Sequence, residues 1–154
     1  MSKIKKFLIS LLILGCGDLD YANRYSMEID EPLQGVYNQF LEDYEFYVGE
    51  PFEPKKYFQI RLSKKGDMYF IKRPWLIGTC EPQKARIVLK RSLLEGKTSG
   101  DYSTLYIILL HEIGHCFFKL PHSKNIRVMR ERLDPEYYEE DIEQFFNEVI
   151  KNER

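Results

Sequence analysis

The chain has 154 residues, which is enough for one domain with a hydrophobic core but not comfortably for two. Its 23 lysines and arginines nearly balance its 24 aspartates and glutamates, so the formal net charge is −1. This balance leaves no basic excess to hold a polyanion, and we expect no nucleic-acid partner. Hydrophobic residues make up 44% and aromatic residues 14% of the chain, which argues against disorder in its body.

The N-terminus differs from the rest of the chain. Three lysines precede an apolar run over residues 7–14, which is too short to span a bilayer but suits a secretory signal. The sequence Ile13-Leu14-Gly15-Cys16 resembles the lipobox of bacterial lipoproteins, and by that resemblance Cys16 would carry a lipid after cleavage. We therefore expect an exported lipoprotein anchored on the periplasmic or cell-surface face, with residues 1–15 as signal peptide, 16–29 as tether and 30–154 as the folded domain. A plain signal peptide or an uncleaved anchor is the alternative.

The first predicted element of the domain is a helix. Asp30-Glu31-Pro32 offers an acidic cap followed by proline in the first turn. Apolar and aromatic residues then recur at helical spacing until Gly49: Leu33, Val36, Tyr37, Phe40, Leu41, Tyr44 and Tyr47. This pattern predicts an amphipathic helix with an aromatic stripe in the core.

Strands are expected next. Phe58, Ile60 and Leu62 alternate with polar residues, which predicts a half-buried strand. Residues 64–67 suggest a turn, and Met68–Ile71 a returning strand. Residues 75–80 are ambiguous, and Ala85–Lys90 predicts a further strand.

A buried helix carries the most informative motif. Residues 105–110 are apolar nearly all round, with Asp101 or Ser103 as cap, and they run into His-Glu-Ile-Gly-His at 111–115. On a helix, His111 and His115 lie one turn apart on one face and can bind a single metal ion. Glu112 is offset but near enough to reach a metal-bound water. This is the H-E-x-x-H arrangement of zinc peptidases, with two ligands and a general base.

A hydrolytic zinc site needs a third protein ligand, and His122 is the expected one. The chain has three histidines, and all lie within residues 111–122. The helix must end first, and since no glycine follows His115, we expect Pro121 to break it between Phe117 and Leu120. In the alternative, a downstream glutamate is the third ligand, as in gluzincins: Glu136, Glu139 or Glu140.

The remainder predicts a loop over residues 123–129 and a last helix. Asp134-Pro135-Glu136 would start that helix, and its buried stripe would consist of Tyr138, Ile142, Phe145, Phe146 and Val149. The predicted fold class is therefore α+β: a small mixed sheet packed with an N-terminal helix, a buried active-site helix and a C-terminal helix.

Two cysteines remain if Cys16 carries lipid. Cys80 and Cys116 then give an even number of thiols in an oxidising compartment, so we expect them to form a disulfide. The alternatives are two buried thiols, or Cys116 as a sulfur ligand of the metal. The second is disfavoured because Cys116 lies about 100° round the helix from His115.

The motif at 111–115, with His122 and then Met129, resembles the metzincin clan of zinc endopeptidases. The nearer likeness is to short bacterial metallopeptidase-like proteins with H-E-x-G-H-C, then His, then Met. The resemblance implies that Met129 forms a turn below the metal, and that Tyr137 or Tyr138 could supply a hydroxyl to the oxyanion, with simple packing as their other role. Two departures stand out: six residues instead of five separate the last two histidines, and Phe118 replaces the usual glycine.

The function expected from these residues is peptide-bond hydrolysis with one zinc ion and Glu112 as general base. The substrate would be a peptide or protein, with strand 85–90 as a candidate for pairing with it. One alternative is a non-catalytic lipoprotein, in which the histidines hold a structural ion and the domain acts as a binding module. In the other, the motif is accidental and the domain binds no metal.

Overall fold

A computed structural model describes residues 27–54, 56–95, 102–133 and 137–153. Within these ranges the strands are β1 (Met27–Ile29), β2 (Phe58–Leu62), β3 (Gly78–Glu81) and β4 (Arg86–Leu89). The α-helices are α2 (Gln34–Val48), α3 (Met68–Lys72), α4 (Ser92–Glu95), α5 (Tyr102–Cys116) and α6 (Glu139–Glu153), with 3-10 turns η2 (Glu31–Leu33), η3 (Pro82–Lys84) and η4 (Arg127–Met129). The architecture is α+β, as expected. Among the described residues, no helix has the length and apolarity needed to cross a membrane.

The strands form one mixed sheet in the order β1-β2-β4-β3. β2 pairs in parallel with both β1 and β4, while β3 pairs antiparallel with β4. Since β4 has a neighbour on each side, the prediction that strand 85–90 pairs with substrate is wrong. Among the described strands, β1 and β3 are the edges, and only an edge strand can accept a further strand.

Two sequence predictions fail at the sheet. Residues 27–29 were expected to belong to a tether but form β1, which pairs with β2 in register from Met27 opposite Phe58. Residues 16–26 lie outside the described residues. The expected strand at Met68–Ile71 is the helix α3. A hairpin return onto β2 is impossible because β1 and β4 already occupy both of its edges.

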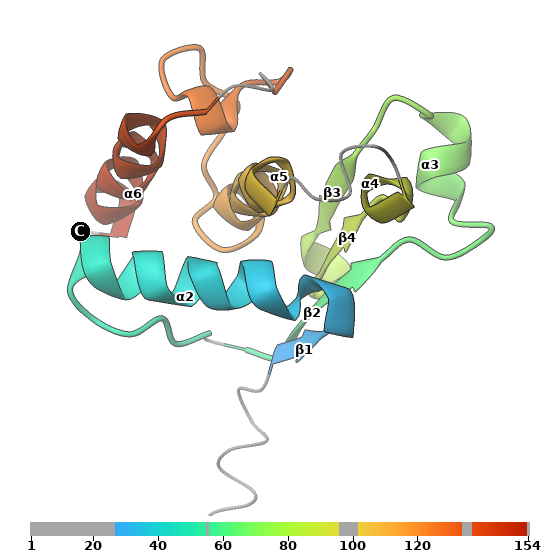
Figure 1. Cartoon of the computed structure of the whole chain (residues 1–154), viewed down its shortest axis with the longest axis horizontal. Coiled ribbons are helices and arrows are strands. Elements are labelled where there is room, and N and C mark those ends of the chain that lie inside the picture. The colour runs from blue at the N-terminus through green and yellow to red at the C-terminus, as the bar shows by residue number, and fades with distance from the viewer. Residues whose placement is uncertain (1–26, 55, 96–101, 134–136, 154) are drawn as a thin grey trace, which may run out of the picture.

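Three helices build most of the core beside the sheet. Figure 1 looks along α5, which lies between α6 and the sheet, and α2 crosses below it. α5 packs on α2, β3 and β4, while α6 packs on α2 and η4. The predicted aromatic stripe of α2 is confirmed, since Tyr37, Phe40 and Tyr44 are buried, and Gly49 ends the helix with a positive φ of 87°.

The C-terminal helix begins later than expected. α6 starts at Glu139, and residues 134–136 lie outside the described residues. Asp141, in the first turn, accepts a hydrogen bond from the Tyr138 backbone N–H at 3.0 Å, which fixes the start of the helix. Tyr138 therefore precedes the helix and is 56% exposed rather than buried, while Phe145, Phe146 and Val149 lie in the core as predicted.

Candidate metal centre

The motif sits at the C-terminal end of a buried helix. Residues 105–110 of α5 and Ile113 are all buried, because the helix is covered by the sheet on one side and by α2 on another. The Tyr106 hydroxyl donates a hydrogen bond to the Asp43 carboxylate of α2. α5 is therefore held firmly, and a firmly held helix fixes the rotamers of the side chains that it carries.

The three histidines come together at the end of α5. Each offers one ring nitrogen, and these nitrogens all lie within 4.8 Å of one another. The ring centroids of His111 and His115 are 4.5 Å apart, and that of His122 lies 5.3 and 4.7 Å from them. His111 is buried, His115 is half-buried and His122 is exposed, so the group opens toward solvent on one side.

Backbone carbonyls orient two of the rings. The Nδ1 atoms of His111 and His115 each lie 2.7 Å from a carbonyl oxygen, those of Val128 and Leu120 respectively. Each Nδ1 therefore carries the proton and donates it, so each Nε2 presents a lone pair. Burial lowers the pKa of His111 to about 4 and also lowers the pKa of His115, which keeps both rings neutral.

The loop after α5 returns His122 to the helix. α5 ends at Cys116, one residue before the predicted range, and Lys119 adopts a left-handed conformation with φ 54°. The Leu120 backbone N–H then donates to the Gly114 carbonyl at 2.9 Å, so the chain doubles back over the last turn. Lys119 makes the turn that a glycine would make more easily, so Pro121 does not by itself break the helix as the sequence predicts.

Glu112 lies between α5 and β3, and it is 6% exposed. Its carboxylate accepts a hydrogen bond from the Cys80 backbone N–H, but burial outweighs this bond and raises its pKa to about 8. A Cβ at Gly78 would lie 2.7 Å from Glu112 Oε1, so the strand can approach the carboxylate only because residue 78 has no side chain. The importance of Gly78 follows from this contact and could not be read from the sequence alone.

Met129 lies directly beneath the motif. Its side chain is fully buried, and a Cβ at Gly114 would lie 2.6 Å from its Sδ. Gly114, the fourth residue of the motif, therefore makes room for the methionine. The role of Met129 as a turn below a metal, which the metzincin resemblance implies, stays a prediction, while the neighbouring Val128 supplies the carbonyl that orients His111.

A disulfide joins Cys80 of β3 to Cys116 of α5, with Cα atoms 5.5 Å apart. It links the two cysteines that the sequence analysis paired. It also holds β3 against the end of α5, one residue from His115, and so keeps Glu112 beside the edge strand.

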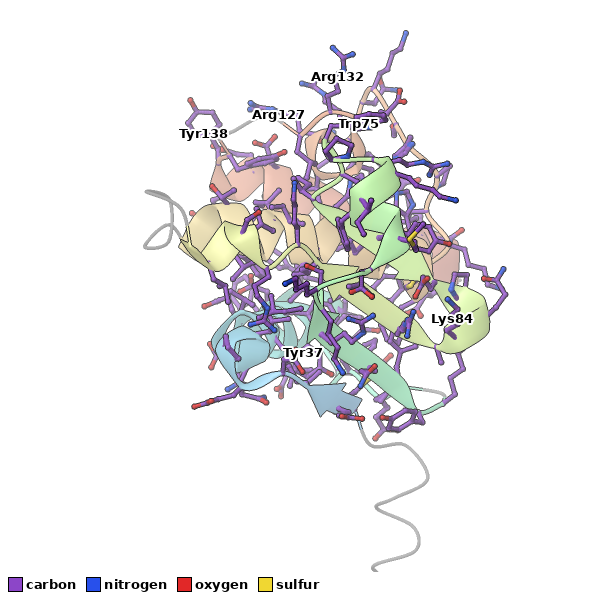
Figure 2. The ribbon with its side chains drawn as sticks, turned by 90° about the vertical axis from the view of Figure 1, so that its right-hand side faces the viewer. Tyr37, Trp75, Lys84, Arg127, Arg132 and Tyr138 are labelled. Carbon is purple, nitrogen blue, oxygen red and sulfur yellow. A yellow bond between two sulfur atoms is a disulfide. The ribbon has the colours of Figure 1, made fainter. Side chains whose placement is uncertain are left out.

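The two candidate oxyanion residues lie against a cation. The Arg127 guanidinium is 5.8 Å from the Tyr137 ring centroid and 5.5 Å from that of Tyr138. Arg127 also pairs with Asp141 at 3.1 Å, and Figure 2 shows Arg127 and Tyr138 at the same end of the molecule. These contacts support the packing role, and a catalytic role for either tyrosine stays a prediction.

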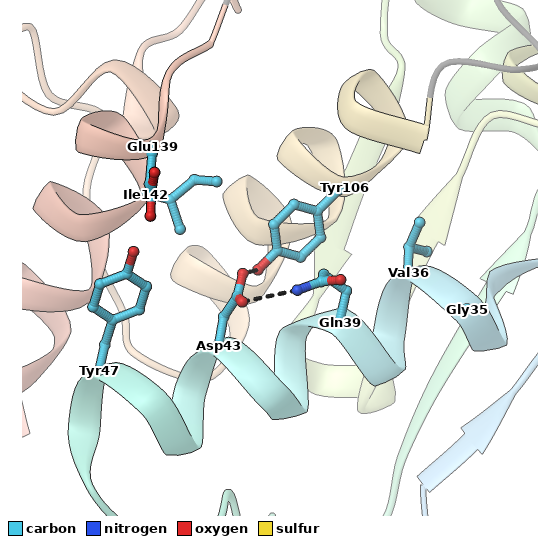
Figure 3. A pocket seen from close by; sticks show the side chains of 8 residues that line it. All are labelled: Gly35, Val36, Gln39, Asp43, Tyr47, Tyr106, Glu139 and Ile142. Atoms are coloured by element: carbon cyan, nitrogen blue, oxygen red, sulfur yellow. Dashed lines mark hydrogen bonds between the residues drawn. The ribbon is translucent and has the colours of Figure 1, made fainter.

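A separate recess of about 400 Å³ opens between α2, α5 and α6 (Figure 3). Asp43, Tyr47 and Tyr106 line it, together with Glu139. None of the three histidines belongs to its lining. Glu139, one of the alternative third ligands, thus faces this recess, and the structure brings His122 to the other two histidines instead.

The three histidines could hold a metal ion, and their spacing is compatible with zinc. The Nε2 atoms of His111 and His115 lie 3.1 Å apart, and as both carry lone pairs they repel each other unless a cation lies between them. Zinc binds imidazole nitrogen at about 2.0–2.1 Å, so two tetrahedral ligands stand about 3.3 Å apart, close to the observed separation. Comparisons of the chain with protein-family models, curated proteins and solved structures find no match. The functional argument therefore rests on the chemistry of these side chains.

Proposed function

We propose that this protein is a zinc-dependent endopeptidase that uses His111, His115 and His122 as ligands and Glu112 as general base. The observation that carries the proposal is the convergence of three imidazoles at the end of the helix that also carries a buried carboxylate. Two of the imidazoles are oriented by main-chain carbonyls, as metal-ligating histidines usually are. Among the described residues the group holds three donors, so a zinc ion bound there would have a fourth position for water, as hydrolytic sites require.

The role of Glu112 follows from its surroundings. A zinc ion bound to the imidazoles would acidify water and polarise the scissile carbonyl. Glu112 accepts the proton of the attacking water and passes it to the leaving amine, so the side chain ends the cycle as it began. A nearby cation lowers the pKa of a carboxylate, so metal binding favours the ionised base that this step needs.

The open edge of β3 suits an extended peptide. Among the described strands, β3 pairs only with β4, and the Cys80 N–H on the other side points to Glu112. A peptide added beside β3 would therefore run past the carboxylate. β-Strand addition supplies main-chain hydrogen bonds and does not by itself select a sequence.

Export and lipid attachment at Cys16 belong to the same proposal. Residues 1–26 lie outside the described residues, so the signal peptide and the membrane anchor stay predictions. The Cys80–Cys116 disulfide supports them, because such bonds persist in oxidising compartments.

The test combines metal analysis with a cleavage assay. We expect the purified full chain to hold one zinc ion and to cleave members of an unstructured peptide library, read by mass spectrometry. His122→Ala should lose zinc and activity, whereas Glu112→Gln should keep zinc and lose activity. Zinc held by four protein ligands, with no cleavage by the native chain, would instead establish the structural-zinc alternative. Native protein without zinc would refute both.

A further inference from the structure

The end of the molecule that carries α3 exposes an unusual group of large side chains. Four of them stand in solvent over a stretch of eight residues: Met68 (55% exposed), Tyr69 (45%), Ile71 (60%) and Trp75 (76%). We call this group the α3 face. α3 buries none of its five residues. Exposed apolar groups of this size in one place mark an interaction surface.

The α3 face is held rigidly in this exposed position. At its start, the Asp67 carboxylate pairs with the buried Arg61 at 3.0 Å and accepts the Lys64 backbone N–H at 2.7 Å. At its end, the Lys90 ammonium donates to the Pro74 carbonyl. The apolar side chains therefore project from an anchored segment, and their exposure is part of the fold.

Cations surround the α3 face. The exposed basic residues in and beside this segment are Lys64, Lys65, Lys72, Arg73 and Arg91, while Asp67, at its start, pairs with Arg61. The helix α6 carries six acids and one lysine over residues 139–153, and one of these acids, Asp141, pairs with Arg127. Figure 1 shows α3 and α6 at opposite ends of the molecule, so the cations around the α3 face lie far from the acids of α6.

We propose that the α3 face binds an anionic membrane surface. Tryptophan and tyrosine favour the interface between headgroups and acyl chains, methionine and isoleucine enter the apolar layer, and lysine and arginine contact anionic headgroups. The cations around the α3 face would attract it to an anionic surface. This contact is distinct from the proposed lipid on Cys16 and does not depend on the peptidase proposal.

The chain contains its own probe for this contact. Trp75 is the only tryptophan, so the fluorescence of the full chain reports the α3 face alone, even if the N-terminus also binds lipid. Figure 2, which views the molecule from this end, shows the Trp75 ring at the surface. The probes are vesicles of phosphatidylcholine, with or without phosphatidylglycerol.

With phosphatidylglycerol vesicles we expect Trp75 emission to move to shorter wavelength, to be quenched by lipids brominated on the acyl chains, and to lose its accessibility to acrylamide. Pure phosphatidylcholine should have little effect, and high salt should reverse the change. If Trp75 stays accessible to acrylamide while the protein sediments with the vesicles, the proposal is wrong. The proposal is also wrong if both vesicle types change the Trp75 fluorescence equally, or if neither type changes it. In the last case a protein partner would be the ligand of the α3 face.

Variants separate the apolar and the charged contributions. Met68→Ser with Ile71→Ser should abolish brominated-lipid quenching. Lys65→Gln with Lys72→Gln should weaken binding about thirtyfold, since each contact near an anionic surface contributes about 1 kcal/mol. The matched control is Phe46→Ser, which removes an equally exposed side chain (78%) from α2, away from this end, and should change nothing. A Phe46 effect equal to that of the α3 variants would overturn the assignment.

Discussion

Two buried carboxylates lie near the disulfide, and the fold shifts their pKa values in opposite directions. Glu81, next to Cys80, is 4% exposed and pairs with Arg86 and with Lys84. Burial alone would raise the pKa of Glu81, but these two partners outweigh it, so the pKa is lowered. Glu112 is equally buried, yet among the described residues no cation pairs with it, and its pKa rises to about 8.

The difference is the one expected between a structural carboxylate and the general base that we propose. A buried charge normally requires a partner, and Glu81 has two. Glu112 has one backbone N–H, which orients the carboxylate but does not neutralise it. A buried acid without a cationic partner lowers the stability of the fold. The cation site that we propose beside Glu112 would explain why the fold keeps such an acid.

The largest expected effect is on activity. Glu112→Gln keeps the size and the Cys80 contact but removes the base, so the turnover number should fall about 10²–10⁴-fold with zinc content unchanged. Glu81→Gln should alter turnover by less than about threefold, because Glu81 does not face the histidines. Initial rates on one peptide, at equal zinc content, compare the two. Equal losses would show that Glu112 acts through structure alone.

The disulfide should give the next largest effect. Replacing Cys80 and Cys116 together by serine opens a covalent loop with a sequence separation of 36 residues and should lower the free energy of unfolding by about 4 kcal/mol. Chemical denaturation of the zinc-free protein measures this. Because the bond holds β3 beside Glu112, activity should fall too. A variant with native stability would mean that packing of β3 on α5 suffices.

A smaller effect is expected from Glu81→Gln on stability. The change removes the charge that faces Arg86, whose side chain is 26% exposed, so water can partly compensate. The free energy of unfolding should fall by roughly 1–3 kcal/mol. In the zinc-free protein Glu112→Gln should instead be neutral or stabilising at pH 8, since it removes a buried charge. Destabilisation by both changes would contradict the comparison.

The pH dependence of stability should have opposite signs at the two residues. The folded pKa of Glu112 lies above its ordinary value of 4.5, so its contribution is fully present below pH 4.5 and is lost as the pH rises through about 8. The folded pKa of Glu81 is lowered, so its contribution is present above pH 4.5 and is lost as the pH falls. Denaturation of zinc-free protein and both glutamine variants across this range tests the signs. Parallel curves for native protein and Glu112→Gln would exclude the shift at Glu112.

The parts of the site that follow from local geometry could be predicted from the sequence. His111 and His115 share a helix face because of their spacing, and the apolar run before them buries the helix. The aromatic stripe of α2 follows from the same periodicity. His122 can approach this pair only because the helix ends before it. The motif and Pro121 predict the position of that helix end only approximately.

The missed features depend on contacts between distant segments. Met68–Ile71 has the residues of a strand, and only the occupied edges of β2 exclude it from the sheet. β1 has three residues, too few for an alternating pattern to appear. Nothing in the sequence marks Lys119 as left-handed, because lysine has no preference for positive φ. The edge position of β3 likewise follows from strand order.

The acceptors of the His111 and His115 Nδ1 protons are main-chain oxygens, which every amino acid possesses. Replacing the side chain of Leu120 or Val128 leaves those oxygens in place, provided that the backbone keeps its path. The loop can therefore diverge in evolution while the imidazoles keep their orientation. The residues that cannot change freely are those that determine the backbone path of the loop. Gly114 is the most important of them.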